Sequence, residues 1–245
     1  MTVNKVPPLR GWAWVQDGFR LFLRNPLTWI VMGLVLMGAT YLLSRIPYLG
    51  TPLVYLLSPL PIAGMMAGCR DLEHGAPLSI NHLLSGFRDG ATDLVTLGGV
   101  FVIAQILIGA IVSNMAGSDW EELMRSGAIF DPTAVSPEMA NRLSAAMVVG
   151  MMLMVPVSLL LWFSPALVIL DGVPAGRAMV LSLQGCLANV MPTLIYGLAM
   201  MLLLILVALT LGFGMFVWLP LAVTSAYRSY REIYITDEKD ALEPS

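Results

Sequence analysis

One short stretch of this chain brings together side chains that could do chemistry. Residues 69–74 read Cys-Arg-Asp-Leu-Glu-His, so a thiol, two carboxylates and an imidazole lie close together, and His82 follows. Thiolate and imidazole are the ligands that zinc prefers, and a carboxylate with an imidazole is a common acid–base pair. However, the spacing matches no standard zinc site, and the chain offers no second pair of ligands. We therefore expect His74 and His82 to be ordinary cytoplasmic loop residues.

A second candidate is a methionine-rich stretch. Of the 17 methionines, Met147, Met151, Met152 and Met154 cluster in one apolar run, and thioethers can bind Cu(I). Methionine also fills packed and lipid-facing helix surfaces, and we expect that role here. The chain contains no nucleophile-elbow, phosphate-loop, zinc-protease or dinucleotide-binding motif. We therefore predict that the protein is not an enzyme, holds no cofactor or metal and binds no nucleic acid.

The elements around these residues are those of a membrane protein. Of the 245 residues, 58% are hydrophobic and only 12% are charged, and the mean hydropathy is +0.80. Soluble domains carry about 25% charged residues, and the apolar stretches here exceed the ~18 residues that mark a spanning helix. Cys69 and Cys186 lie near the predicted cytoplasmic ends of their segments. We expect them to be buried thiols without a disulfide, because that compartment is reducing.

We predict an all-α fold, a polytopic transmembrane helix bundle with six spans. The spans are expected at residues 27–43, 48–68, 94–115, 143–170, 190–209 and 211–227. Proline interrupts the hydrogen-bond ladder of a helix, so kinks are expected in the second, fourth and sixth spans. The residues concerned are Pro59, Pro61, Pro156, Pro165 and Pro220.

Lysine and arginine residues indicate how the chain crosses the membrane. With the N-terminus inside, ten of them fall on the inner side, and only Arg45, Arg125 and Arg142 fall on the outer side. Cytoplasmic loops of membrane proteins carry the excess of positive charge. We therefore expect a protein of the bacterial inner membrane with both termini in the cytoplasm and residues 113–142 as a periplasmic loop.

A pattern that recurs three times organises these spans. Each copy has a short amphipathic segment and then two long apolar stretches, the second of which carries a proline. The copies align at Phe19, Phe87 and Leu183, each six positions before Asn25, Asp93 or Asn189. We therefore divide the chain into three repeats, residues 1–77, 78–172 and 173–235, each an interfacial helix with a helical hairpin. Residues 236–245 are expected to form a disordered cytoplasmic tail.

The amphipathic segments are expected to lie in the membrane interface. Apolar and polar side chains of residues 11–24 fall on different helical faces, and Asn25-Pro26 then turns the chain into the bilayer. The predicted role is to seal the cytoplasmic rim and set the angle of each hairpin, with docking of a cytoplasmic protein as the alternative. The residues expected to anchor these segments among membrane lipids are Trp12, Trp14, Phe19, Arg20, Phe22, Arg24, Phe87 and Arg88.

Small residues predict where helices approach closely. Gly64 and Gly68 are four residues apart in the second span, and Gly98 and Gly99 are adjacent in the third. Gln105, the strongest polar group inside a span, is expected to form an interhelical hydrogen bond. The spans hold no ionisable residue near their predicted midplane, which argues against an ion-coupled transporter or a proton relay.

The outer loop is a candidate docking surface. Asp119, Trp120, Glu121 and Glu122 are predicted to start a short helix with Ser118 as its N-cap. Two interpretations remain open for this loop. It is either a solvated acidic loop or a surface on which a partner docks, since long ordered loops are often functional.

The chain also resembles a family of uncharacterised six-span inner-membrane proteins of proteobacteria. The resemblance rests on Gly11-Trp12-x-Trp14-x-x-Asp17-Gly18-Phe19-Arg20-Leu21-Phe22-x-x-Asn25-Pro26, on Ile46-Pro47-x-Leu49-Gly50 and on residues 64–70, Gly-Met-Met-Ala-Gly-Cys-Arg. It covers the chain from Val6 to about Tyr234. It implies the same membrane fold and brings no reaction, ligand or catalytic residue.

Three classes of function stay open at this stage. The first is a non-enzymatic accessory or scaffold subunit of a larger membrane complex, with a membrane-protein partner or a second copy of the chain. The second is a permease or channel for a lipid or another apolar or neutral solute, with a cavity lined by residues such as Gln105 and Asn114. The third is a membrane enzyme whose active site uses cytoplasmic groups such as Asp71, His74 and His82.

Overall fold

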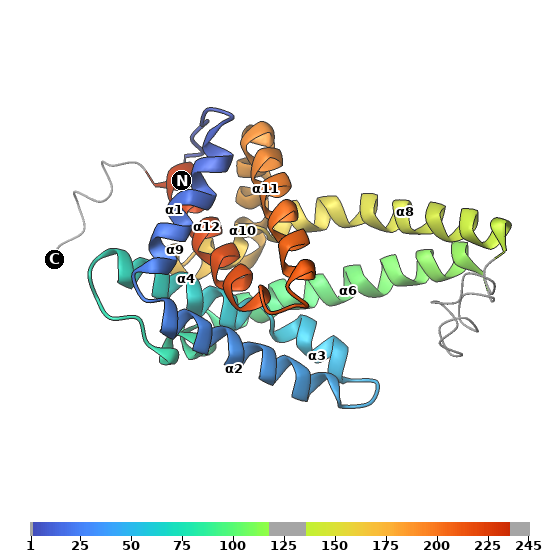
Figure 1. Ribbon diagram of the computed structural model, residues 1–245, viewed down its shortest axis with the longest axis horizontal. Helices are drawn as coiled ribbons and strands as arrows, with labels where there is room; N and C mark the ends of the chain where they lie inside the picture. Colours follow the sequence, from blue (N-terminus) through green and yellow to red (C-terminus); the bar gives the residue numbers. More distant parts are fainter. Residues whose placement is uncertain (1, 118–135, 236–245) are drawn as a thin grey trace.

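In the part of the chain that the computed structural model describes, residues 2–117 and 136–235, every regular element is a helix (Figure 1). The predicted all-α fold is therefore confirmed. The elements are α1 (Arg10–Leu23), α2 (Pro26–Ser44), α3 (Gly50–Leu57), α4 (Pro59–Glu73), the 3₁₀ helix η1 (Ile80–Leu84), α5 (Ser85–Arg88), α6 (Ala91–Ala116), α8 (Pro137–Leu161), α9 (Ser164–Asp171), α10 (Ala175–Ala188), α11 (Val190–Leu209) and α12 (Met215–Tyr234). The predicted tail and the four acidic-loop residues 119–122 lie outside the described residues.

Five helical segments in the described part are long and apolar enough to cross a membrane. They are Pro26–Ser44, Gly50–Glu73, Ala91–Ala116, Pro137–Asp171 and Val190–Leu209. The sixth predicted span is not among them. Its helix, α12, begins only at Met215 and carries Arg228, Arg231 and Glu232 in its second half. Five spans therefore have the composition of membrane helices, and the sixth stays a prediction.

Two of the predicted kinks are complete breaks between helices. The second span divides at Ser58 into α3 and α4, where Pro59 follows, and the fourth divides at Trp162 and Phe163 into α8 and α9, where Pro165 follows. A proline cannot donate the ladder hydrogen bond, so the chain changes direction before it. By contrast, Pro156 and Pro220 lie inside continuous helices.

The amphipathic segments differ in their regularity. The first and third are helices of 14 residues, α1 and α10. The second, predicted as one helix, consists of the 3₁₀ helix η1 and the short helix α5. It ends where Asp89 leaves the helical conformation and Gly90 adopts a positive φ of 72° before α6 begins. Ser79 caps η1 in a capping box with His82.

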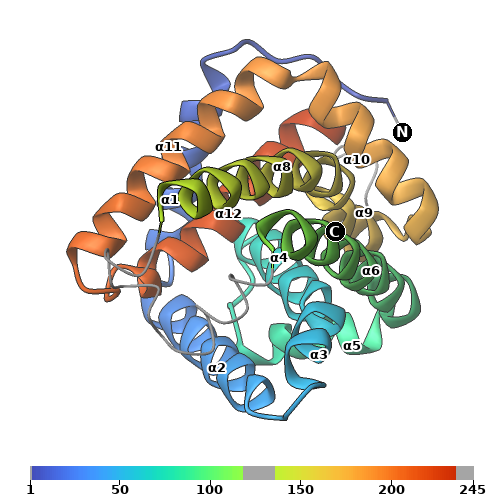
Figure 2. The same cartoon turned by 90° about the vertical axis from the view of Figure 1, so that its right-hand side faces the viewer.

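Each amphipathic segment packs on the second helix of a different hairpin (Figure 2). Helix α1 packs on α12, where a Cβ added at Gly18 would lie 2.6 Å from the Cα of Ser225. The pair η1 and α5 packs on α4, where a Cβ at Gly86 would lie 2.2 Å from the carbonyl oxygen of Leu60. Helix α10 packs on α8 and α9, and Ser182 Oγ donates to the carbonyl oxygen of Leu159 over 2.7 Å. Gly18, Gly86 and Ser182, each directly before an aligned position of the sequence repeat, thus all make close contacts with the helix on which their segment packs.

The hairpin of α6 and α8 projects from the rest of the molecule as an arm (Figure 1). Only 11% of the most apolar window of α6 is buried. Its exposed side chains are large and apolar, as in Ile103, Ile106 and Leu107, and α8 adds Met147, Met151 and Met152. Such a surface is stable only against lipid or another protein.

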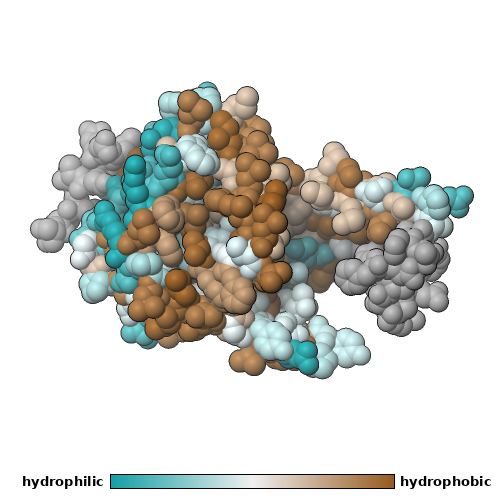
Figure 3. Space-filling model, in the orientation of Figure 1, coloured by the Kyte–Doolittle hydropathy of each residue, from teal (hydrophilic) through white to brown (hydrophobic). Residues whose placement is uncertain are grey.

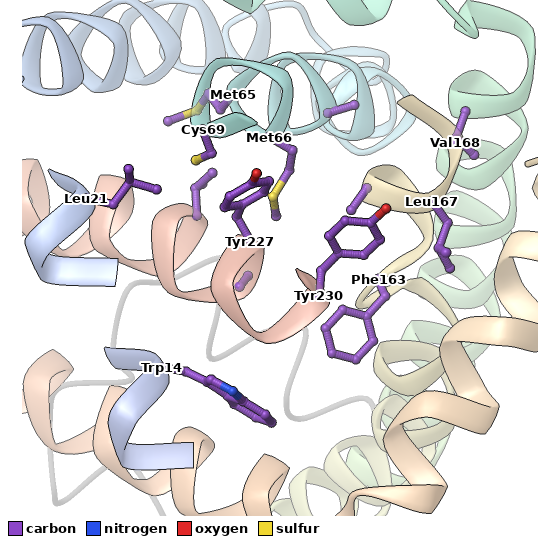
Figure 4. Packing of buried hydrophobic residues seen from close by; sticks show 14 of the residues in the cluster. Trp14, Leu21, Met65, Met66, Cys69, Phe163, Leu167, Val168, Tyr227 and Tyr230 are labelled. Carbon is purple, nitrogen blue, oxygen red and sulfur yellow. The ribbon is translucent and has the colours of Figure 1, made fainter. Parts of the chain in front are cut away.

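The core lies around the second half of α12 (Figure 4). Tyr227 faces α4 near Met65 and Met66, while Tyr230 lies toward α9, near Phe163. Both tyrosine side chains are almost completely buried. Buried aromatic side chains need a partner for each hydroxyl, and these partners belong to the polar groups described next.

Candidate functional site

A chamber lies where the second helices of the three hairpins meet. It has a volume of about 360 Å³ and is lined by α4, α8 and α12, with contributions from α2 and α9. Its walls are almost entirely apolar. The side chains that define this axial chamber include Met65, Met66, Leu161, Trp162, Ala222 and Val223. It can hold hydrocarbon, because it offers almost no hydrogen-bonding groups to a polar molecule.

Two further cavities share walls with the axial chamber. The first, the α2–α4 groove, has a volume of about 570 Å³ and shares Leu36, Ile62 and Leu219 with the chamber. The second, the α8–α11 cleft, measures about 360 Å³ and shares Ser158 and Trp162 with the chamber. The three cavities therefore adjoin one another between the hairpins and share apolar wall residues.

A few polar atoms lie at or beside the α8–α11 cleft. Tyr196 and Ser225 are hydrogen-bonded to each other through their hydroxyls, 3.0 Å apart. Thr193 also lines the cleft, and its Oγ1 is buried without a hydrogen-bond partner among the described residues.

A charged junction closes one end of the bundle, where α1, α4 and α12 meet. Glu73 of α4 accepts hydrogen bonds from Tyr227, over 2.7 Å, and from Arg231, over 2.5 Å, and it also pairs with Arg228. Hydrophilic residues gather at this end of the molecule, near the N-terminus (Figure 3). Both carboxylate oxygens of Glu73 are thus occupied.

The second half of the junction joins the first helix to the last. Arg10 Nε donates to Glu232 over 2.7 Å, and Trp14 Nε1 donates to the other oxygen of that carboxylate over 2.6 Å. The hydrogen bond to Glu232 raises the pKa of Arg10, although burial acts against it. Asp17 lies 3.7 Å from Arg10 and 2.9 Å from Arg20.

These groups line a polar cavity of about 430 Å³. Because the carboxylates of Glu73, Glu232 and Asp17 all have cationic or hydrogen-bonding partners, none is poised as a free base. The arrangement instead ties the two ends of the chain to α4.

The side chains of residues 69–74, which could do chemistry, point to different surroundings in the fold. Cys69 points into the core beside Met65, and its thiol is free (Figure 4). His82 Nε2 lies 3.0 Å from Asp71, but His74 turns back to the carbonyl oxygen of Arg70. Within the described residues, no group of three or more His, Cys, Asp or Glu side chains is arranged to hold a metal ion.

The predicted interfacial anchors fall into two groups. Trp12, Phe19 and Phe87 are exposed, between 42% and 50%. Trp14 and Phe22, in contrast, are buried inside the protein, so their prediction as anchors was wrong. The reason is that α1 packs on α11 and α12, which bury its other face through Gly11, Trp14, Gly18 and Leu21.

The predicted arginine anchors also differ in their surroundings. Arg20 pairs with Asp17 on its own helix, and Arg24 donates to the carbonyl oxygen of Leu72 over 3.2 Å. Arg88 is exposed at the end of α5. Only Arg24 therefore makes a contact outside its own helix among these three, judged from the described part of the chain.

The four glycines that were predicted at close helix contacts differ in their surroundings. A Cβ at Gly64 would lie 1.9 Å from the carbonyl oxygen of His82, and one at Gly98 would lie 1.9 Å from that of Leu56. Gly68 faces the side chain of Leu78 at 2.7 Å. Gly99 has no neighbouring atom within 4 Å of such a Cβ. Three of the four glycines thus lie at close contacts between elements.

Sequence reasoning missed the tyrosines of α12. Tyr227, Tyr230 and Tyr234 recur at helical spacing, which places them on one face, and Arg228 and Arg231 lie between them. Tyr230 donates to Asp171, and burial, with the nearby Asp171 charge, raises the pKa of Tyr230. This spacing of hydroxyls and guanidinium groups near the end of an apolar run was the available signal.

Comparison with known proteins gives one informative relative. The chain is 28% identical to a probable inner membrane protein of Burkholderia thailandensis over 233 residues, which covers 93% of this chain and 84% of the relative. No family model matches the chain, and no solved structure matches it. Together with the five apolar helices, this similarity identifies an integral protein of the inner membrane. The resemblance to uncharacterised inner-membrane proteins is confirmed.

Proposed function

We propose that this non-enzymatic inner-membrane protein is a permease that takes up a lipid or another apolar molecule in the axial chamber. The observation that carries this proposal is the set of three adjoining apolar cavities between the hairpins. The chamber shares residues with the α2–α4 groove and with the α8–α11 cleft. Because both openings lie between membrane helices, hydrocarbon can enter from the bilayer without crossing water.

The proposed architecture is a ring of three repeats with six spans, in which α12 provides the sixth. The cyclic contacts support it, since each amphipathic segment packs on the preceding hairpin and α1 closes the ring on α12. Two aligned polar residues make matching contacts. Asp93 accepts from the amide of Ala175, the first residue of α10, and Asn189 accepts from the amide of Val6, four residues before α1. Asn4 and Ile235, near the two ends of the described chain, line the polar cavity of the charged junction, which we assign to the cytoplasm.

The lining differs from the one expected from the sequence. Gln105 and Asn114 do not line the chamber, the groove or the cleft. The walls of the chamber are formed mainly by the second helices of the hairpins, and Pro165 is among the lining residues. Apolar walls favour a molecule with a long hydrocarbon part over a small polar solute.

The test is lipid exchange between the leaflets of proteoliposomes. Ala222→Trp would fill the axial chamber, and Leu202→Trp on the exposed side of α11 is the matched control. We expect the wild type and the control to accelerate movement of a tail-labelled fluorescent phospholipid, and Ala222→Trp to remove most of the acceleration. Exchange no faster than in protein-free liposomes would refute the proposal.

The α6–α8 arm supports the second candidate, an accessory or scaffold subunit of a larger membrane complex. Its apolar surface is exposed on both helices, in contrast to the buried faces around α12. A partner helix or a second copy of this chain would cover it. The residues predicted to dock a partner, 119–122, belong to the segment between α6 and α8.

Purification in a mild detergent, followed by mass spectrometry, tests this candidate. Leu107→Trp changes the surface of the arm, and Leu198→Trp is a control on α11 with similar exposure. We expect a stoichiometric protein partner that Leu107→Trp alone displaces. Absence of any co-purifying protein, together with a monomeric mass, would exclude an accessory role.

A further inference from the structure

We propose that the α2–α4 groove binds a phospholipid with an anionic headgroup, whose acyl chain lies in the groove and whose phosphate lies at Arg45. This inference rests on the proposed uptake of a lipid and names its chemical class and its point of entry. Three independent features of the groove support it: its lining, its length and the charge at its mouth.

The lining of the groove suits a hydrocarbon chain. Only three of its residues, Thr40, Tyr41 and Ser58, carry polar side-chain atoms. Ser58 already uses its hydroxyl, which donates to the carbonyl oxygen of Tyr55 over 3.0 Å. Water would find few partners along this surface, and the groove lies between helices with the composition of membrane spans. An acyl chain of the bilayer is the molecule at hand that fills such a space.

The length of the groove matches one leaflet of the membrane. Along α2 the lining runs from Val35 to Leu43, and Arg45 follows in a helical conformation. At 1.5 Å per residue, the helix from Val35 to Arg45 rises about 15 Å, which is half of a ~30 Å hydrocarbon core. A chain that ends beside Val35 would therefore place its phosphate at the level of Arg45.

No described residue neutralises the charge at the mouth of the groove. Arg45 lies over the ring of Tyr41, 6.0 Å from its centroid, and Tyr41 lines the groove. Among the described residues, no carboxylate lies within ion-pair distance of Arg45, whereas Arg10 and Arg228 are both paired. A guanidinium group can bind a phosphate through two parallel hydrogen bonds. Arg45 is thus placed to hold an anionic headgroup.

The loop that follows Arg45 is suited to the depth of a headgroup. Tyr48 is 98% exposed and Leu49 is 61% exposed. Large apolar and aromatic side chains at this exposure are stable in the membrane interface, where the ring lies among headgroups. In the proposed orientation this is the outer leaflet of the inner membrane. The bound lipid therefore comes from that leaflet.

The experiment compares the lipids that stay bound when the protein is released from nanodiscs for native mass spectrometry. The discs contain phosphatidylcholine and phosphatidylglycerol with identical acyl chains. Arg45→Gln removes the charge, Arg45→Lys keeps it, and Arg177→Gln makes the same charge change on the exposed surface of α10, away from the groove. We expect about a tenfold loss of bound phosphatidylglycerol for Arg45→Gln, a small loss for Arg45→Lys and none for Arg177→Gln.

A second pair of variants tests the tail. Val54→Trp fills the groove, and Ile103→Trp adds the same bulk to the exposed surface of α6. We expect Val54→Trp alone to lose the bound lipid of both classes. If Arg45→Gln behaves like Arg177→Gln, the anionic headgroup is refuted, even where Val54→Trp shows that a tail binds.

If Val54→Trp also retains the bound lipid, the groove is refuted as its site. Neither result depends on leaflet exchange, which tests the chamber through Ala222→Trp. Failure of the lipid class and failure of the proposed function are therefore distinguishable.

Discussion

Replacing two adjacent glycines of α6 by alanine is expected to have opposite effects. A Cβ at Gly98 would lie 1.9 Å from the carbonyl oxygen of Leu56 on α3, whereas Gly99 has no atom within 4 Å of its added Cβ. Ordinary contacts of a Cβ begin near 3.4 Å. Helices α3 and α6 must therefore move apart by about 1.5 Å in Gly98→Ala, since a helix backbone cannot yield as a side chain does.

The free-energy cost of moving α3 away from α6 can be estimated. The same helices share an edge-to-face contact between Tyr55 and Phe101, with ring centroids 5.2 Å apart, and separation would weaken it. Overpacking of this kind costs about 1–3 kcal/mol. At about 2–4 °C per kcal/mol for a chain of this size, Gly98→Ala should lower the melting temperature by about 2–12 °C. Gly99→Ala should leave it unchanged or raise it slightly, because alanine is the better helix former.

The assay is thermal unfolding of both variants and the wild type in one detergent, followed by circular dichroism and by tryptophan fluorescence. The two variants carry the same added methyl group at adjacent positions. Each therefore controls for effects of the substitution on expression or detergent binding in the other. Equal melting temperatures for Gly98→Ala and Gly99→Ala would contradict the close packing of α3 on α6.

Three further predictions concern the charged junction, a buried thiol and the packing of α10 on the break between α8 and α9. Glu73→Gln should destabilise the protein by about 2 kcal/mol and lower the melting temperature by about 4–8 °C, because two arginines lose their counter-charge; an unchanged melting curve would show that the junction does not hold α4 to α12. Burial raises the pKa of the Cys186 thiol to about 12, so we expect no maleimide labelling of the native protein at pH 7–8 and full labelling after denaturation. Ser182→Ala should cost about 1–3 kcal/mol in unfolding experiments, because it leaves the buried amide of Phe163 without its partner and removes the hydroxyl that donates to the carbonyl oxygen of Leu159, at the break between α8 and α9. A cost below about 0.5 kcal/mol would contradict that role.

The sequence is sufficient for the class and the helices of this fold. Long apolar runs identify five spans, since hydropathy alone decides whether a helix is stable in a bilayer. The proline breaks before Pro59 and Pro165 were also predictable as kinks, because the constraint is local. Whether α12 spans the membrane was not predictable, because its apolar first half favours a span and its charged second half does not.

Burial of the first amphipathic helix shows why the contacts between distant helices were not predictable from the sequence. Trp14 resembles an interfacial tryptophan by its position in the sequence, and only the packing of α1 on α11 and α12 places it beside Glu232. That contact joins residues 218 positions apart. Similarly, the axial chamber combines short stretches of α4, α8 and α12, and no local pattern indicates which helices meet. The recurring six-residue spacing was the only sequence signal related to this arrangement.

The most direct test of the central proposal is to label the protein in a bilayer with a phospholipid that carries a photoreactive group near the end of its acyl chain. After illumination, mass spectrometry of peptides locates the labelled residues. We expect label on Ala222 and Val223 of α12 and on Met65 and Met66 of α4, in addition to the exposed face of α11. Label confined to exposed helix faces, with none on the walls of the axial chamber, would contradict the account.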